Sequence, residues 1–264
     1  MSEIKIPIPT QPDTIWNLRH LGDVDSTNSY ATDLAKKGLP EGQVILADHQ
    51  SAGRGRLDRD WIDSPGSSVL MSILLRPKFP PQFFYLITAA LSLAASQILK
   101  SKFFISCKLK WPNDVMVADK KICGILAEAA YGGVENTWVV AGIGLNCMQS
   151  GDELAGLGQS ATSILAESGV RLSEEGRIDL AQQLAAQFAS LYVSLEDSDQ
   201  RIGLRGLYRS ACDTIGKPVR VEMPGETLTG VASDISPEGN LLVETGSGMR
   251  AVPAGDVIHL RKDF

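Results

Sequence analysis

The alternation of apolar and polar positions divides the chain into helical and extended segments. Apolar residues recur at helical spacing over 82–101 and again over 177–195. A shorter helix is predicted to begin at the capping side chains of 25–28 and to end at Lys37, because Gly38 suits the position after a helix. Strands are predicted at the short apolar runs 44–47 and 69–75 and near 104–110, 115–118, 122–130 and 137–145.

The remaining segments indicate the domain organisation. Residues 1–20 are predicted to be an irregular lead-in, too short for a helix-turn-helix module of its own. Residues 151–173 are rich in Gly and Ser, with a short helical piece around 163–167. From about residue 215 the pattern changes to short β-type runs between Pro and Gly turns, at 219–221, 228–232, 241–243, 249–252 and 257–260. This part predicts a small antiparallel barrel with a boundary near 212–217, and the mixed first part makes the fold class α+β.

Composition and charge mainly exclude whole classes of protein. With 264 residues, 44% hydrophobic and 21% charged, the chain can bury a core, so disorder is excluded as its main state. A net charge of −6 disfavours nucleic-acid binding through bulk charge. The uncharged stretch 83–99 is short for a membrane span and carries Thr88, Ser92 and Ser96 at every fourth position, so a core helix and no membrane are predicted.

The cysteines and the N-terminus indicate the compartment. Cys107, Cys123, Cys147 and Cys212 form no CxxC pair and no cluster with histidine. A disulfide framework or a zinc site is therefore not expected, and a reducing, cytoplasmic location fits. The mixed, proline-broken start of the chain does not resemble a signal peptide.

The loop 50–61 is the first segment with candidate chemistry. Its glycines allow the backbone to approach a ligand, and Arg54, Arg56 and Arg59 can each fork onto phosphate or carboxylate oxygens. Asp58 and Asp60 interleave with the arginines and leave a net charge of only +1. A shaped anion site is therefore favoured over a nucleic-acid surface, and the alternative is a solvated arginine turn.

Three later segments place polar groups on or beside strands. Residues 108–114 carry alternating lysines followed by Asn113 and Asp114, which could equally be a polar turn after an edge strand. Lys121 precedes an apolar strand, either over a pocket or in a solvated hairpin. Alternating glycines in 142–146 suggest a backbone packed against something flat, with close strand–helix packing as the rival explanation.

In their order and combined content, these segments resemble the biotin protein ligases, also called biotin–[acetyl-CoA-carboxylase] ligases. The resemblance rests on DSTN at 25–28, GRGR at 53–56, KWPND at 110–114, the 121–128 segment, GIGLN at 142–146 and ATSI at 161–164. It runs from about residue 21 to the C-terminus. Asp58 stands where the family usually has Gly, which is expected to affect loop ordering or nucleotide affinity.

The resemblance implies a fold and an activity. The fold is a class II synthetase-like catalytic domain with a mixed sheet flanked by helices, over 1–213, followed by a C-terminal SH3-like barrel over 214–264. The activity joins biotin to ATP with Mg²⁺, giving biotinyl-5′-AMP and pyrophosphate, and then transfers biotin to one lysine of a biotin carboxyl carrier domain. Without a DNA-binding module at its start, the chain is expected to be monofunctional. Family members occur as monomers and as homodimers, often pairing sheet edges, so the oligomeric state stays open.

The resemblance also implies roles for individual residues. Lys121 would bridge the biotin carboxylate and the α-phosphate, and Asp114 would orient or deprotonate the attacking amine. Trp61 would stack on adenine, whereas a core position is predicted for Trp111. The implied catalytic residues are Lys121, Arg56, Asp114 and Lys110, with no protein metal ligand. The implied biotin and ATP site comprises Ser26, Thr27, Asn28, Gln50, Gly53, Arg54, Gly55, Arg56, Arg59, Trp61, Asn113, Lys121, Gly124, Gly142, Gly144 and Asn146.

Three other functions compete with this interpretation. A lipoate or octanoate ligase or transferase would share the catalytic fold, but the GRGR loop and the C-terminal barrel argue against it. A regulator that binds the biotin adenylate without transferring it is disfavoured by the intact set of Arg56, Lys110, Asp114 and Lys121. Residues 100–121 carry a net charge of +4, from six lysines against two aspartates, which would suit nucleic acid or an acidic carrier face. The acidic whole chain makes nucleic acid the weaker choice.

Overall fold

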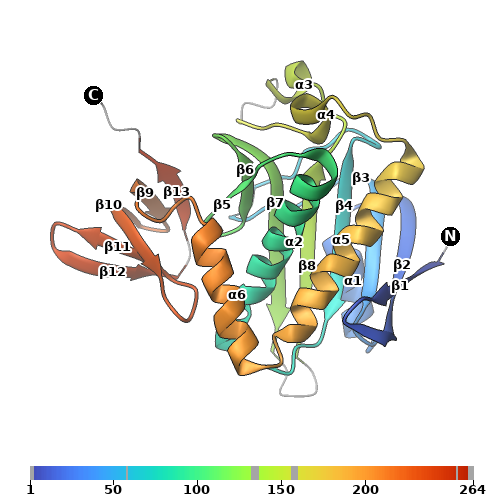
Figure 1. Cartoon of the computed structure of the whole chain (residues 1–264), viewed down its shortest axis with the longest axis horizontal. Helices are drawn as coiled ribbons and strands as arrows, with labels where there is room; N and C mark the ends of the chain where they lie inside the picture. The colour runs from blue at the N-terminus through green and yellow to red at the C-terminus, as the bar shows by residue number, and fades with distance from the viewer. Residues whose placement is uncertain (1–2, 58, 132–136, 156–159, 254, 261–264) are drawn as a thin grey trace.

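The chain folds around one large mixed sheet and one smaller antiparallel sheet (Figure 1). The computed structural model describes residues 3–57, 59–131, 137–155, 160–253 and 255–260. The large sheet has the order β1-β2-β3-β4-β8-β7-β6-β5, and its β2–β3 pair is parallel while its other pairs are antiparallel. Its strands are β1 (Glu3–Ile8), β2 (Gln11–Val24), β3 (Gln43–Gln50), β4 (Ser68–Leu75), β5 (Lys108–Lys110), β6 (Asp114–Val117), β7 (Lys120–Ala130) and β8 (Trp138–Asn146). The predicted α+β class is confirmed.

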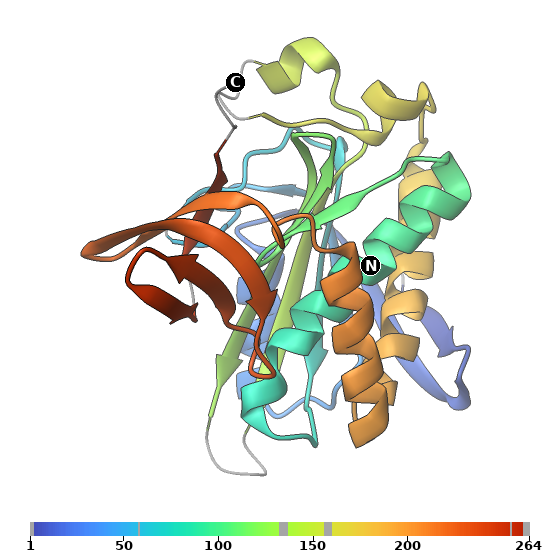
Figure 2. The same ribbon diagram turned by 60° about the vertical axis from the view of Figure 1, so that its left-hand side comes forward.

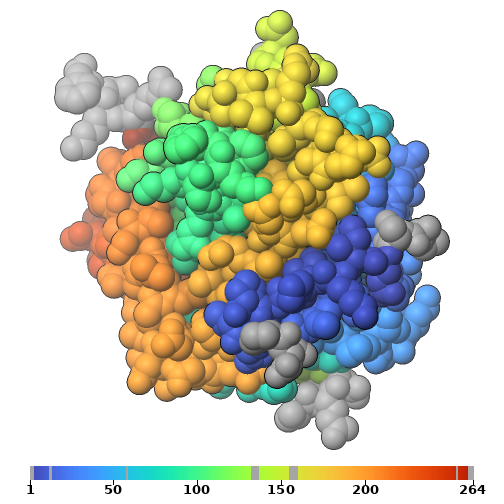
Figure 3. Space-filling view, turned by 45° about the vertical axis from the view of Figure 1, so that its right-hand side comes forward, coloured from blue at the N-terminus to red at the C-terminus, as the bar shows by residue number. Residues whose placement is uncertain are grey.

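Helices cover both faces of this sheet. On one face lie α2 (Tyr85–Phe103), preceded by the short η1 (Pro81–Phe83), and α5 (Glu174–Ser194), with α6 (Ser198–Ala211) beside them. Figure 3 shows the side chains of these helices and of the β1–β2 hairpin forming one closed surface over that face. The opposite face packs against α1 (Thr27–Lys36), and the short helices α3 (Gly151–Ala155) and α4 (Ile164–Ser168) lie at one end of the sheet.

The central strand β4 explains why the sheet needs cover on both sides. All of its residues are buried, as expected for a continuous apolar run. Val69, Met71, Ile73 and Leu75 face the main core with α2 and α5, whereas Leu74 packs with α1. The alternation therefore also turns Ser72, the one polar residue within 69–75, toward the α1 face.

The C-terminal part forms the second sheet, in the order β12-β11-β10-β9-β13. All five predicted β-type runs are strands: β9 (Pro218–Met223), β10 (Glu226–Ile235), β11 (Leu241–Thr245), β12 (Gly248–Val252) and β13 (Asp256–His259). Within the described residues no pairing joins β12 to β13, so the sheet is not a closed barrel. It docks beside α6 (Figure 2), where Arg205 donates to the carbonyls of Ser236 and Ile235, and Arg209 pairs with Asp234 at 2.6 Å.

The prediction for residues 1–20 is wrong. Residues 3–20 belong to the β1–β2 hairpin, in which Ile6, Ile8, Trp16 and Leu18 alternate into the core. The helix α6 had no counterpart among the predicted elements. The predicted core helix is confirmed: the segment Pro81–Phe103 is long and apolar enough to cross a membrane by length and composition alone, but here α2 packs between the sheet, α5 and α6.

Candidate active site

A hairpin carrying the GRGR sequence reaches over the sheet on the α1 face. We call residues 50–62 the arginine hairpin. Asp58, whose effect on the loop was predicted above, lies outside the residues that the structure describes. Its two arms are joined by the Trp61 N–H donating to the Gly53 carbonyl at 2.9 Å and the Gly55 N–H donating to the Arg59 carbonyl at 2.6 Å. These bonds fix which side chains of the hairpin face the sheet.

Where the sheet faces the hairpin, three positions of β7 and β8 are glycine, and we call these positions the glycine floor. Gly124 of β7 and Gly144 of β8 are direct cross-strand partners. A Cβ on Gly144 would lie 2.4 Å from Cε2 of Trp61, and one on Gly124 would lie 2.8 Å from Cε of Lys121. The indole therefore lies directly on the two strands. Of the alternating glycines in 142–146, Gly144 confirms the prediction of a flat neighbour, which is Trp61, whereas Gly142 meets Asn28 of α1 and so follows the rival explanation of close strand–helix packing.

The third glycine of the floor, Gly142, is in close contact with a side chain of α1, that of Asn28. A Cβ there would lie 2.1 Å from Oδ1 of Asn28. That amide is held on both sides: Ser72 Oγ donates to its Oδ1 at 2.6 Å, and its Nδ2 donates to Glu128 Oε2 at 2.7 Å. Glu128 also accepts from Arg54 at 2.9 Å, which ties the arginine hairpin to β7.

Next to this network, the N-terminus of α1 opens on a narrow cavity, the first cavity. Ser26 caps the helix, with its Oγ accepting from the Ser29 N–H at 3.5 Å. Gln50 Oε1 accepts from both the N–H and the hydroxyl of Thr27, at 2.8 and 2.9 Å. The carbonyl end of the Gln50 amide is thereby fixed, and its NH₂ end, toward Gly53, remains for another acceptor.

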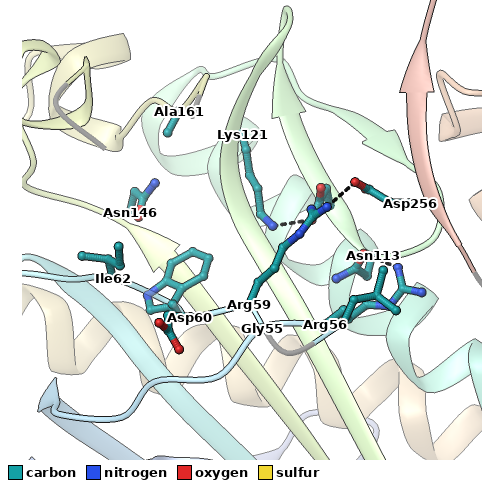
Figure 4. A pocket seen from close by; sticks show the side chains of 13 residues that line it. Gly55, Arg56, Arg59, Asp60, Ile62, Asn113, Lys121, Asn146, Ala161 and Asp256 are labelled. Carbon is teal, nitrogen blue, oxygen red and sulfur yellow. Dashed lines mark hydrogen bonds and ion pairs between the residues drawn. The ribbon is translucent and has the colours of Figure 1, made fainter. Parts of the chain in front are cut away.

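Trp61 also lines a second cavity, where Arg56, Arg59, Asn113 and Lys121 lie near one another (Figure 4). Lys121 Nζ forms an ion pair with Asp114 Oδ1 at 2.6 Å in it, and Arg59 pairs with Asp256 of β13. Arg56 donates to Asn113 Oδ1 at 3.3 Å and to the Gly255 carbonyl at 3.4 Å. Burial lowers the pKa of Arg56, and the nearby carboxylates act against that shift.

The two cavities have a common wall, formed by Gly55, Arg56, Trp61, Asn113 and Lys121. Of the predicted residues, those that line the first cavity are Ser26, Thr27, Asn28, Gln50, Arg54, Gly55, Arg56, Trp61, Asn113, Lys121, Gly124, Gly142 and Gly144. Those that line the second are Gly55, Arg56, Arg59, Trp61, Asn113, Asp114, Lys121 and Asn146.

Two predicted residues line neither cavity. Gly53 acts through its carbonyl, which accepts from the Trp61 N–H. Lys110 lies opposite Asp114 in the β5–β6 pair, and its charge instead contributes to lowering the pKa of His259 in β13 to about 4, after the larger effect of burial. The position predicted for Trp111 is confirmed: it is buried, and its Nε1 donates to the Gly239 carbonyl.

Sequence reasoning missed three contributors. Ser72 could have been found, because a lone hydroxyl in a buried apolar run needs a partner. Glu128 was included in a motif but given no role. Asp256 left no signal, since it meets Arg59 across 197 positions of chain.

Known proteins resemble this chain along most of its length. A family model for the biotin/lipoate A/B protein ligase family matches residues 22–146, and one for the biotin protein ligase C terminal domain matches residues 214–260. The biotin–[acetyl-CoA-carboxylase] ligase of Mycobacterium tuberculosis is 33% identical, over 92% of this chain and 90% of that protein. The bifunctional ligase/repressor BirA of Bacillus subtilis is 32% identical, over 89% of this chain and 71% of that protein. The solved biotin protein ligase from Aquifex aeolicus, in complex with biotin and ATP, superposes with a TM-score of 0.74 at 26% identity, covering 93% of this chain and 99% of that one.

Proposed function

This chain belongs to the biotin protein ligases, and from that premise we propose how its two cavities divide the reaction. The protein is an ATP-dependent ligase that attaches biotin to a carrier protein. The common wall supports this division of the reaction between the two cavities. The biotin carboxylate and the α-phosphate must meet at one place, and the cationic side chains of the wall can reach both of them there.

The first cavity is proposed to hold biotin. A urea ring needs donors for its oxygen and acceptors for its N–H groups inside an otherwise apolar slot. The fixed amide of Gln50, the capping hydroxyl of Ser26 and the amide network of Asn28 supply such groups at one end. The glycine floor lets Trp61 and Lys121 lie low on the sheet and form one side of this slot, and the apolar tail then points toward the common wall.

The second cavity is proposed to hold the nucleotide, with Trp61 against adenine. In the first step a carboxylate oxygen of biotin attacks the α-phosphorus of ATP, and the bond to pyrophosphate breaks. Arg56, Lys121 and the backbone of Gly55 lie in the common wall and offset the negative charge that gathers there.

In the second step an uncharged lysine amine of the carrier attacks the carbonyl of the mixed anhydride, and AMP leaves. We assign Asp114 to this step. In the free enzyme its carboxylate neutralises Lys121 at 2.6 Å. Once Lys121 turns to the phosphate, Asp114 becomes an acceptor for a proton of the incoming amine.

Mg²⁺ is proposed to enter as part of the MgATP substrate. Three carboxylates of the described residues line the second cavity, and two of them, Asp114 and Asp256, are already paired with Lys121 and Arg59, which leaves Asp60 as the one that could contribute to the ion. The ion is therefore expected to be held mainly by phosphate oxygens and water, as is usual for Mg²⁺.

The remaining assignments concern domains and partners. We place the catalytic domain at 1–213 and an SH3-like domain at 214–264, supported by the separate C-terminal sheet. Beyond Gly124, the outer edge of β7 has no strand partner among the described residues, which offers an edge for a biotin carboxyl carrier domain or for a homodimer. The four cysteines are free thiols, and this fits a cytoplasmic enzyme.

The test is pyrophosphate release from MgATP with biotin, lipoate, octanoate or no acid, while the mass of a biotin carrier domain is followed. Biotin-dependent release with a carrier mass gain of one biotinyl group is expected. Turnover with lipoate or octanoate alone would contradict the assignment of the first cavity. Release without a mass gain would instead indicate an adenylate that is held and not transferred.

The glycine floor gives a first prediction. Gly144→Ala places a methyl group where the indole of Trp61 now lies, so we expect the KM for biotin to rise by about 10- to 100-fold. Gly206→Ala is the control, since nothing lies within 4 Å of a Cβ at that helical position. Equal KM values for wild type and Gly144→Ala would contradict the proposed floor.

The contribution of the C-terminal sheet gives a second prediction. Asp256→Asn removes the charge that holds Arg59 at the second cavity, and the KM for MgATP should rise by about two- to fivefold, the size expected of an exposed ion pair. Asp234→Asn breaks the Arg209 pair in the same sheet, away from the cavities, and should leave this KM unchanged. An equal KM for MgATP in the two variants would contradict this role, and would mean that Asp256 only helps to dock the C-terminal sheet.

A further inference from the structure

A hydrogen bond between a half-buried histidine and a buried aspartate side chain lies at the base of the arginine hairpin. His49 is the second-last residue of β3, and Asp63 is the residue that follows the hairpin, 14 positions later. His49 Nδ1 and Asp63 Oδ2 are 2.9 Å apart. An ionised carboxylate can only accept, so the ring nitrogen is the donor. The pair therefore joins the two ends of the hairpin through their side chains.

The environment of this pair makes it more than a surface contact. The Asp63 side chain is 0% exposed, whereas that of His49 is 27% exposed. Burial raises the pKa of Asp63, and the hydrogen bonds from His49 and from the backbone of Gln50 oppose the rise. A buried carboxylate persists only where hydrogen bonds compensate for its lost hydration. The interaction is thus confined to one geometry of the hairpin base.

That geometry determines where ligand-facing groups fall. Gln50 follows His49 directly and carries the amide of the first cavity, while Trp61 lies two residues before Asp63 and covers the glycine floor. The other tethers of the hairpin, Arg54 to Glu128 and Arg59 to Asp256, lie nearer its tip and are partly exposed. Of these three tethers, each formed between two titratable side chains, the one between His49 and Asp63 lies nearest in sequence to both Gln50 and Trp61.

We propose that His49 and Asp63 are positioning residues for the ligase reaction: they hold the two ends of the arginine hairpin together, so that Gln50 and Trp61 stand on opposite sides of one bound biotin. Neither side chain lines the cavities, so the effect passes through the hairpin alone. The proposal rests on the assignment of biotin to the first cavity.

The chain offers a matched control for this pair. His20 Nε2 and Asp48 Oδ1 are 3.0 Å apart and join the neighbouring strands β2 and β3. This second pair also joins a histidine to an aspartate of β3, but Asp48 has a further partner in Arg177 at 3.1 Å, and the pair does not connect the ends of the hairpin. His20→Asn therefore removes a histidine–aspartate pair without releasing the hairpin base.

The experiment measures the KM for biotin and kcat of pyrophosphate release, together with the lifetime of the enzyme-bound adenylate without carrier. Asp63→Ala is expected to raise the KM for biotin and lower kcat/KM by about 10- to 100-fold, the scale of an ångström-sized misplacement, with a smaller change in kcat. The adenylate should be released faster. Asp63→Asn keeps an acceptor for His49 but loses one acceptor oxygen and the charge, so its values should fall between those of Asp63→Ala and wild type, and His20→Asn should match wild type.

If Asp63→Ala does not fold, His49→Ala provides the same test from the more exposed side. A KM for biotin that stays at the wild-type value in both variants, or an equal rise in His20→Asn, would overturn the proposal. So would a lowered unfolding temperature as the sole effect, because a purely structural role predicts that result. Failure of the wild type to use biotin at all is a different outcome and would count against the assigned function instead.

Discussion

Lys121→Met is expected to lower kcat of adenylate formation by about 10²- to 10³-fold, the cost of removing one preorganised donor from developing charge. Methionine keeps the apolar part of the side chain, which reaches over Gly124 as far as Cε, so the packing of the floor is retained, while the Nζ that lies 5.8 Å from the centroid of the Trp61 ring is lost. What is lost is the ammonium group between the biotin carboxylate and the α-phosphate. Single-turnover formation of the adenylate measures this step without carrier transfer.

The neighbouring lysine supplies the control. Lys120 is exposed at the β6–β7 turn and lines neither cavity, so Lys120→Met should retain full activity. Removing Lys121 also leaves Asp114 without its 2.6 Å partner, which adds a destabilising effect on the empty enzyme. The unfolding temperature of both variants is therefore measured alongside. An adenylation rate of Lys121→Met within a few-fold of wild type would refute its role.

Arg56→Met is expected to cause the second large loss, about 10²- to 10³-fold in kcat/KM for MgATP. The guanidinium lies in the common wall, and its Nη1 donates to both Asn113 Oδ1 and the Gly255 carbonyl, which leaves its other nitrogens for a phosphate. Arg56→Lys keeps one charge but loses the further donors of the planar guanidinium, so it should fall between wild type and Arg56→Met. Initial rates over a range of MgATP concentrations give the values.

Arg205 is the matched control for Arg56. It also donates to backbone carbonyls of the C-terminal part, those of Ser236 and Ile235, but outside both cavities. Arg205→Met should weaken the docking of the sheet and spare kcat/KM for MgATP. Equal losses in the two variants would mean that Arg56 serves docking and not the nucleotide.

Local signals in the sequence predicted much of the fold. The helix α1 follows from the Ser26 cap and from Gly38, and the five C-terminal strands follow from apolar runs between turns. The β1–β2 hairpin was missed because the prolines near the N-terminus suggested an irregular segment. Its pairing with β3 and its packing on α5, where Trp16 meets Phe188, are long-range contacts that decide the outcome.

The site was predictable where its chemistry is concentrated in motifs. Glycines at alternate strand positions indicated a flat neighbour, although only the fold identifies it as Trp61. Groups that depend on packing between distant segments were not predictable. Asp256 reaches Arg59 from another sheet, and Lys110, although part of the KWPND motif, lies on an edge strand that takes it out of both cavities.

The contacts of Arg56 and Arg59 with Gly255 and Asp256 have a thermodynamic consequence. The arginine hairpin and the C-terminal sheet share a boundary that also borders the second cavity. Coupling free energies are reciprocal, so any ligand whose binding tightens this boundary must hold the sheet in place by the same amount of free energy. Amide hydrogen exchange measures how often β13 opens. Its rate in β13 should therefore report what fraction of the enzyme has ligand bound.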